Sequence, residues 1–374
     1  MWDLFLLIAG AVLGVIATKI DEYIKRRNVV KRNITSLRRI PEYNPQNDDI
    51  LLLRQWNSND KLNEQKAEII YDESRIYDLV FPKIKCPYIT APDKWETMYA
   101  EELKKETKRA GSVSYVTYYS PDHKDTVNGN KLTIKVSTCD YLAHDVNSKY
   151  FATHPNDWNT LKQMIIEGKY NDYFNFAMPG NVFVNFIVIN AQTNHILAIK
   201  RSNQELNGRN IWGLGGFETM NDIANVAHGS EEKTLQGIVY RGLWEELAIE
   251  RQEVTQVAIS SLSLVKHLGV MVTALVRIDL VGSEDQNSNN GKSALTEGEF
   301  IQRVLRKSES GFEHSCIKWL PIDLKEMKQY IENETGFYND VIKTYDGNEA
   351  KWISYVKLQM YQTWLNHDCI GVSL

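Results

Sequence analysis

Two short stretches decide the fold of this chain: Trp212-Gly213-Leu214-Gly215-Gly216-Phe217 and Arg241-Gly242-Leu243-Trp244-Glu245-Glu246-Leu247-Ala248-Ile249. The first has three glycines in six residues, which is typical of a tight turn. The second is predicted to be helical, because leucine or valine stands at positions 235, 239, 243 and 247 and gives one apolar face. Helical spacing places residues 242, 245 and 246 together on one face.

This turn and helix resemble the Nudix box, whose pattern is Gly, five residues, Glu, seven residues, then Arg-Glu-aliphatic-x-Glu-Glu-x-Gly-aliphatic. The positions that match are Arg241, Leu243, Glu245, Glu246 and Ile249. The positions that depart are Gly242, where the family has a metal-binding Glu, Lys233, where the pattern has its first Glu, and Ala248, where it has its last Gly. If Gly216 is the first glycine, the box also holds an insertion of about eleven residues.

The resemblance implies a chemistry for the matching residues. In the family, metal ions activate a water that hydrolyses phosphate-linked nucleoside derivatives, and a carboxylate helps to deprotonate it. Glu245 and Glu246 would ligate Mg²⁺, and Arg241 would orient them by pairing with an acid, so these three are the catalytic candidates. With two acidic positions lost, the resemblance leaves both a working and a non-working enzyme open. A Lys in place of a carboxylate favours holding a phosphate over holding a cation.

Some Nudix proteins take one more carboxylate from a distal loop. In this chain three glutamates downstream of the box qualify, and the sequence does not choose among them: Glu297, Glu299 and Glu313.

The segment before the box extends the resemblance and supplies ligand-binding candidates. Two apolar runs, 182–189 and 195–200, flank a polar turn and predict a hairpin. Lys200 and Arg201 follow at the strand end. They are candidates for phosphate contact, and the alternative is that the side chain only extends along the sheet edge. Trp212 and Phe217 are candidates to stack on a base, with core packing as the alternative for Trp212. Gly215 and Gly216 let the backbone approach the ligand or the helix closely.

The pattern predicts an α+β fold, a Nudix-like mixed-sheet α/β/α sandwich with an N-terminal extension and one transmembrane helix. Further strands are expected at 113–119, 132–138, 254–265 and 270–281, and helices at 93–110, 156–170, 323–331 and 350–366. The expected division is 1–20, a transmembrane anchor; 21–84, a basic stalk and connector; 85–175, an extension or subdomain; and 176–374, the Nudix-like domain.

The N-terminus is apolar. Residues 4–18, LFLLIAGAVLGVIAT, carry no charge and approach the roughly 20 residues that cross a bilayer. Basic residues follow this run, which by the positive-inside rule predicts a single-pass anchor with the C-terminal domain in the cytoplasm. A signal peptide or an interfacial helix remain as alternatives. Gly10 and Gly14 form a G-x-x-x-G that favours self-association, so a homo-oligomer and a lipid bilayer are expected partners.

Composition excludes some partners. The 374 residues include 43% apolar ones, which is enough for a sizeable core, and a net charge of −5 disfavours duplex nucleic acid. The cysteines are widely spaced, without a C-x-x-C pair, and read as thiols in a reducing compartment. They are Cys86, Cys139, Cys316 and Cys369.

An anchor followed by a degenerate Nudix domain resembles the SMODS-associated Nudix proteins of bacterial cyclic-oligonucleotide (CBASS-type) antiphage defence. That resemblance implies a nucleotide sensor in the inner membrane, which binds a cyclic oligonucleotide and disrupts the membrane as an effector. The alternative is a membrane-tethered Nudix hydrolase that cleaves a nucleoside diphosphate derivative with Mg²⁺. A third reading is a structural membrane-associated domain without a ligand.

Overall fold

The computed structural model of the chain describes residues 50–56, 67–71, 89–105, 112–120, 124–125, 129–130, 132–140, 142–167, 181–202, 210–220, 234–266, 269–280, 295–307, 314–333, 351–368 and 370. The predicted anchor, residues 4–18, and Lys233 and Glu313 lie outside these ranges. Within them, no helix combines the length and apolarity that crossing a membrane requires.

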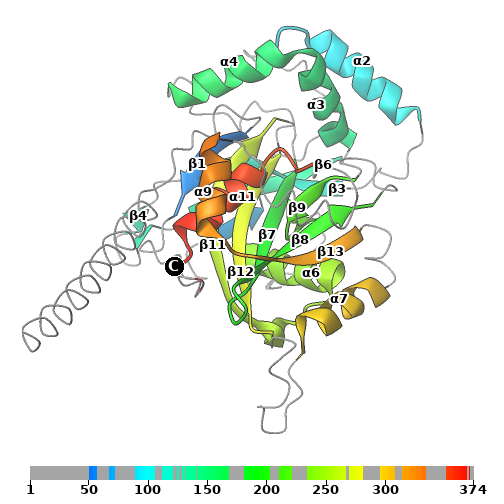
Figure 1. Cartoon of the computed structure of the whole chain (residues 1–374). Helices are drawn as coiled ribbons and strands as arrows, with labels where there is room; N and C mark the ends of the chain where they lie inside the picture. The colour runs from blue at the N-terminus through cyan, green and yellow to red at the C-terminus, as the bar shows by residue number, and fades with distance from the viewer. Residues whose placement is uncertain are drawn as a thin grey trace, which may run out of the picture.

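A mixed eight-stranded sheet forms the centre of the protein (Figure 1). Its main order is β1-β11-β12-β7-β8-β13, with β10 against β7 and β9 against β8. The pair β12 and β7 is parallel, and the other pairs are antiparallel. The strands are β1 (Ile50–Gln55), β7 (Val182–Asn190), β8 (His195–Arg201), β9 (Trp212–Leu214), β10 (Gly216–Thr219), β11 (Val254–Val265), β12 (Val270–Ile278) and β13 (His314–Pro321).

Helices cover both faces of this sheet, and the alternation of strand residues explains why. Along β7, Val184 and Phe186 belong to the core under α6 (Leu235–Leu247), whereas Ile187 and Ile189 belong to the core under α9 (Leu324–Asn333) and α11 (Val356–Leu365). A further helix, α7 (Glu297–Arg306), joins the α6 side. The predicted mixed sheet in an α+β fold is therefore confirmed, with three layers.

The extension builds a second, three-stranded sheet. Strands β2 (Ala67–Tyr71), β6 (Leu132–Asp140) and β3 (Ser112–Ser120) pair in that order, and β4 (Lys124–Asp125) and β5 (Gly129–Asn130) form a small hairpin. Helices α2 (Pro92–Leu103), α3 (Leu142–Thr153) and α4 (Pro155–Ile166) lie at the top of Figure 1. Ile134 and Val136 of β6 belong to the same hydrophobic cluster as Val184 of β7, so one core runs through both sheets.

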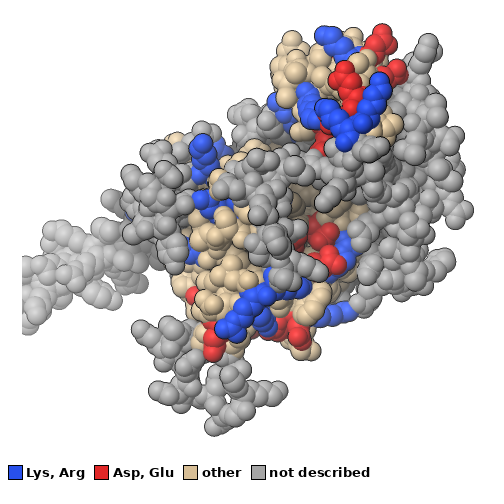
Figure 2. Space-filling view, turned by 90° about the vertical axis from the view of Figure 1, so that its right-hand side faces the viewer, with Lys and Arg blue, Asp and Glu red and all other residues tan. Residues whose placement is uncertain are grey.

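The surface of the extension carries charges of both signs. Glu102 on α2 lies 2.6 Å from the ammonium groups of both Lys105 and Lys149, and these contacts lower the pKa of Glu102. Figure 2 shows acidic and basic side chains interspersed over these helices. The described charges on this face are therefore of mixed sign.

The sequence placed most long elements correctly. The predicted hairpin appears as β7 and β8, with Ile189 paired to Ile196, and the expected strands at 254–265 and 270–281 are β11 and β12. The expected helices at 93–110 and 350–366 are shorter, because α2 ends at Leu103 and α11 begins only at Val356. Strand β1 lies in the stretch expected to be a connector, yet it pairs with β11 and buries Ile50 and Leu51.

Candidate functional site

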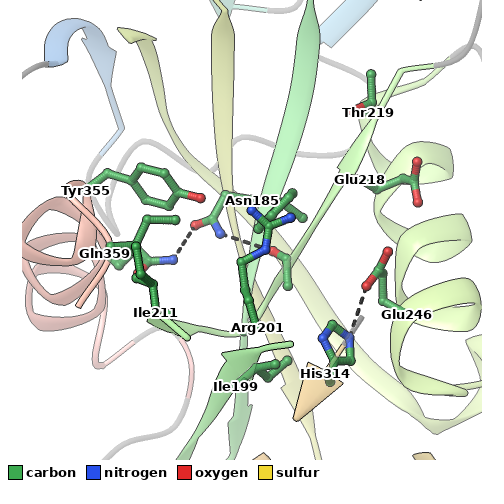
Figure 3. Close-up of a pocket in the computed structure, with 15 residues that line it drawn as sticks. Asn185, Ile199, Arg201, Ile211, Glu218, Thr219, Glu246, His314, Tyr355 and Gln359 are labelled. Carbon is green, nitrogen blue, oxygen red and sulfur yellow. Dashed lines mark hydrogen bonds and ion pairs between the residues drawn. The ribbon is translucent and has the colours of Figure 1, made fainter. Parts of the chain in front are cut away.

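A cavity of about 160 Å³ opens between α6, the turn from β9 to β10, and α11 (Figure 3). Two strands of the sheet line its floor, β7 through Asn185 and β8 through Ile199 and Arg201. The box helix contributes Glu246, and β13 contributes His314 from the far edge of the sheet. Of the ligand-binding candidates, the cavity takes Arg201, Gly215, Gly216 and Phe217.

The glycine turn follows from a close backbone approach. Gly215 has a φ of +68°, and a Cβ there would lie 1.9 Å from the carbonyl oxygen of Phe186. At Gly216 a Cβ would meet the Phe186 ring at 2.7 Å. Any side chain at Gly215 is therefore excluded by both conformation and space. The turn lets its own backbone, rather than side chains, form part of the cavity wall.

Helix α6 begins and ends with defined caps. The Thr234 hydroxyl accepts a hydrogen bond from the Gly237 N–H at 2.9 Å, as an N-cap does. Its C-cap, Ala248, adopts the left-handed conformation with φ +52°. That is the position where the Nudix pattern has its last glycine, and glycine is the residue most often found in a left-handed helix end. The helix therefore ends in a conformation that glycine favours, with Ala in that place.

Gly242 is enclosed by its neighbours. A Cβ at this position would lie 2.6 Å from the Cβ of Glu218 and 2.7 Å from the ring of Phe186. Helix α6 and strand β10 therefore lie too close together at this point for any side chain at position 242. As a result, the side chain of Glu218 approaches α6 from the neighbouring strand.

Glu218 is a site residue that the sequence analysis missed. Arg241 Nη2 donates to Glu218 Oε1 at 3.0 Å, so Arg241 does pair with an acid as expected. The pKa of Glu218 is raised to about 7, mainly by burial and also by the nearby Glu245 and Glu246, while Arg241 opposes the shift. Its position two residues after Gly216, on a strand facing the box helix, was the available signal.

The two box glutamates differ in placement. Glu246 Oε2 lies 3.0 Å from Nε2 of the buried His314, and both residues line the cavity (Figure 3). Glu245 is not among the lining residues; 48% of its side chain is exposed, and its carboxylate lies 3.7 Å from Arg241 Nε. His314 is a second residue that the sequence analysis missed, although its neighbour Glu313 was a candidate.

Neither of the described distal candidates lies at the cavity. Glu297 accepts hydrogen bonds from Asn190 Nδ2 at 2.8 Å and from Thr193, and lies 2.9 Å from His195 Nδ1. These contacts fasten α7 to the β7–β8 turn, and the hydrogen bonds lower the pKa of Glu297 against the effect of its burial. Glu299 closes a capping box with Thr296 at the start of α7.

The remaining ligand candidates divide between cavity and core. The Arg201 guanidinium lies 4.3 Å from the ring centre of Phe217, which is a cation–π contact at the cavity wall. Trp212 is 1% exposed and packs against Trp352, so it belongs to the core. Lys200 pairs with Trp212 and Cys316 across the sheet and is not among the lining residues.

The opposite wall of the cavity comes from the C-terminal segment. Ile353 N donates to Trp212 O at 2.8 Å, and Trp212 N donates to Lys351 O at 2.7 Å, which ties this segment to β9 just before α11. Helix α11 then presents Gln359 to the cavity, after Tyr355 at its N-cap. Neither residue carried a motif in the sequence.

The described residues only partly suit a divalent cation. Mg²⁺ takes oxygen ligands, usually from one or two carboxylates and from substrate phosphates. Glu218 and Glu246 are the carboxylates at the cavity, and both already face a basic partner. In the described ranges, no group of three or more His, Cys, Asp or Glu side chains is placed to hold a metal ion. These residues therefore do not form a resident cation site by themselves.

Comparison with known proteins gives a consistent but shallow likeness. No family model matches the chain, and no curated protein matches it. Among solved structures it resembles DR0079 from Deinococcus radiodurans, with 14% identity, 48% of this chain and 80% of that chain covered, and a TM-score of 0.27. It also resembles a mutT/nudix family protein from Listeria innocua, with 14% identity, coverages of 39% and 80%, and a TM-score of 0.20.

A third similar structure is a bifunctional NMN adenylyltransferase/ADP ribose pyrophosphatase from Francisella tularensis, complexed with AMP and a Mn ion. The identity is 17%, the TM-score is 0.20, and the match covers 53% of this chain and half of that one. Overlap at this level carries no argument about function. The functional argument therefore rests on the residues of the cavity.

Proposed function

We propose that residues 176–374 form a Nudix-like domain that binds a phosphate-linked nucleoside and hydrolyses it poorly or not at all. The support is the convergence of three parts of the motif on one cavity: the glycine turn, the helix carrying Glu246, and the strand-end residue Arg201. Arginine suits phosphate because its planar guanidinium donates several hydrogen bonds in a fixed geometry. Phe217, beside Arg201, adds an aromatic surface.

The observation that carries this proposal is the engagement of the carboxylates. Glu218 is held by Arg241, and Glu246 lies against His314. Position 242 has no room for the missing glutamate, since even a Cβ there would overlap Glu218. A cation would have to displace basic partners from both carboxylates, so binding without efficient turnover is the simpler function of this arrangement.

The finer part of the proposal concerns ligand and location. The ligand class is a nucleotide second messenger, specifically a cyclic oligonucleotide, and the apolar residues 4–18 hold the chain in the bacterial inner membrane. Ligand binding would then cluster the anchors through Gly10 and Gly14 and disrupt the membrane, as in antiphage defence. Its support is the apolar run, the basic residues after it and the degenerate box.

Binding and turnover of the full chain in detergent test the first part. Calorimetry with mono-, di- and cyclic oligonucleotides is expected to give saturable binding, weakened about tenfold or more by Arg201→Ala through loss of a charge-assisted hydrogen bond. Glu96→Gln, exposed on α2, serves as the unaffected control. Absence of binding by every nucleotide would favour a structural domain and end the proposal.

The membrane step has its own test. The full chain is expected to fractionate with membranes and to release dye from anionic vesicles when the bound nucleotide is added. A chain lacking residues 1–20 should bind the same nucleotide but release no dye. Dye release by the truncated chain, or recovery of the full chain in the soluble fraction, would overturn the anchor and leave nucleotide binding untouched.

A membrane-tethered hydrolase is the second candidate, and Glu218 specifically favours it. With a pKa near 7, Glu218 can accept a proton from an attacking water at neutral pH. Any Mg²⁺ would arrive with the phosphates of a nucleoside diphosphate derivative and would polarise them. Fast metal-dependent turnover, lost in Glu218→Gln and Glu246→Gln but kept in Glu96→Gln, would establish this candidate over the sensor.

A further inference from the structure

The cavity has two chemically different halves, which lie on either side of Arg201 in Figure 3. One half carries ionisable side chains and the other carries uncharged polar ones. The ionisable half consists of Glu218, Glu246 and His314. The uncharged half consists of Asn185, Tyr355 and Gln359. A nucleotide has the same division, between a charged phosphate and an uncharged, hydrogen-bonding base.

The uncharged half is held rigidly by a network of amides. Gln359 Nε2 donates to Leu214 O at 2.8 Å and to Asn185 Oδ1 at 2.9 Å, while Leu214 N donates to Gln359 Oε1 at 3.2 Å. Asn185 Nδ2 donates to Gly216 O at 3.0 Å. These bonds use one N–H and one lone pair of the Asn185 amide, so one N–H and one lone pair remain. A fixed donor beside a fixed acceptor is the arrangement with which Asn and Gln read a base edge.

A row of buried polar groups continues from Asn185 across the sheet. The register pairs Asn185 of β7 with Thr273 of β12, and Thr273 with Ser261 of β11. Both hydroxyl groups are 0% exposed, and neither hydrogen-bonds to any residue in the described part of the chain. The same holds for both amide atoms of Gln362 on α11. Buried polar groups without protein partners call for ordered water or a ligand.

The size of the cavity limits what it encloses. Pockets for whole drug-sized ligands measure roughly 300–1,000 Å³. At about 160 Å³, this cavity encloses a part of a nucleotide rather than all of a cyclic dinucleotide. The rest of such a ligand would extend outward, past Arg201.

We infer that the uncharged half is a nucleobase subsite, in which Asn185 and Tyr355 read the hydrogen-bonding edge of the base and Thr273 holds ordered water behind it. Gln359 acts as a positioning residue, because it fixes Asn185 and the backbone of β9. The inference rests on the proposed nucleotide binding. It adds that the wall on the α11 side of the cavity selects the base. Selection then depends on the C-terminal helix, outside the recognised box.

The test compares ligands with and without a base. Calorimetry on the full chain in detergent would measure AMP, GMP, CMP and UMP beside ribose 5-phosphate and pyrophosphate. For Asn185→Leu, we expect the affinity for the preferred nucleotide to fall about tenfold or more. The ratio of the affinities for the best-bound and the worst-bound nucleotide should fall by a similar factor. Pyrophosphate and ribose 5-phosphate should bind within about twofold of the wild type, because the charged half is unchanged.

Two smaller substitutions protect the test from misfolding. Tyr355→Phe and Thr273→Val keep the side-chain volume and remove one hydroxyl each, so they should reduce base preference without unfolding the chain. Thr97→Val, on the exposed face of α2, is the matched control.

Four results would overturn the inference. Unchanged base preference in all three variants would show that another wall selects the base. An equal loss for nucleotides and pyrophosphate would show that these residues only support the fold. If the wild type binds pyrophosphate and every nucleotide equally well, nucleotide binding survives and the base subsite fails; if it binds none of the ligands, both fail.

Discussion

The two helices that enclose the cavity differ in how they reach it. Helix α6 carries the recognisable motif, and its site residues lie within two helical turns or on the adjacent strand β10. Helix α11 carries no motif, yet its Gln359 bonds to Leu214, which is 145 residues earlier in the chain. The first wall is set by local spacing and the second by tertiary docking. Matched pairs of substitutions can therefore measure the contribution of each wall to stability separately.

Restoring the family's glutamate at position 242 should have the largest effect. Because a Cβ at 242 overlaps Glu218 and the Phe186 ring, Gly242→Glu is expected to cost about 3 kcal/mol of unfolding free energy, through overpacking and a further negative charge. Gly298→Glu is the control, since a Cβ there meets nothing within 4 Å, and it should be neutral or slightly stabilising in the first turn of α7. Urea unfolding measures both.

A Gly242→Glu protein as stable as the wild type would mean that α6 can withdraw from β10 without cost. If that protein also gained metal-dependent turnover, the motif wall would be an enzyme site lacking only one carboxylate. Packing around position 242 would then not be what distinguishes the α6 wall from the α11 wall.

Glu218 gives the motif wall a pH dependence. Its folded-state pKa of about 7 lies above its ordinary value of 4.5, so the folded protein binds the extra proton. Stability from this group is therefore complete below about pH 4.5 and is lost as pH rises to about 7, by an amount on the order of 3 kcal/mol. Glu218→Gln should match the wild type near pH 4.5 and exceed its unfolding free energy at pH 8.

Unfolding titrations of both proteins from pH 4.5 to 8 check this expectation, with exposed Glu96→Gln as the control. A difference between Glu218→Gln and wild type that stays constant with pH would show that Glu218 is ionised throughout. In that case Arg241 would outweigh burial at this carboxylate.

The sequence predicted what local spacing controls and little of what docking controls. The box helix, the β7–β8 hairpin and strands β11 and β12 follow from periodicity and turn residues. Glu218 escaped notice because its role depends on β10 lying directly beside Gly242. Glu297 was a reasonable distal carboxylate, but the fold uses it to fasten α7 to the β7–β8 turn.

The C-terminal wall can be broken by one glutamine and left intact by another. Gln359→Leu leaves the backbone N–H and C=O of Leu214 and the side-chain oxygen of Asn185 without this partner. It should lower the unfolding free energy by about 2 kcal/mol. Gln362→Leu, one helical turn on, removes a buried amide that bonds to no described residue, so it should be neutral or stabilising. Urea unfolding measures both variants. An equal loss of unfolding free energy in the two would mean that the Gln359 hydrogen bonds add nothing to the packing that holds α11.

The smallest expected effect lies at the end of the motif helix, where the chain departs from the Nudix pattern by one methyl group. Ala248 adopts a left-handed backbone with φ +52°, which costs an L-residue with a Cβ about 1–2 kcal/mol. Ala248→Gly should therefore raise the unfolding free energy by about 1 kcal/mol, whereas Ala100→Gly, on the exposed face inside α2, should lower it by a similar amount. Thermal unfolding of the pair distinguishes them. If both changes lower the unfolding free energy, the left-handed backbone at Ala248 is not strained, and Ala at this position costs the protein no stability.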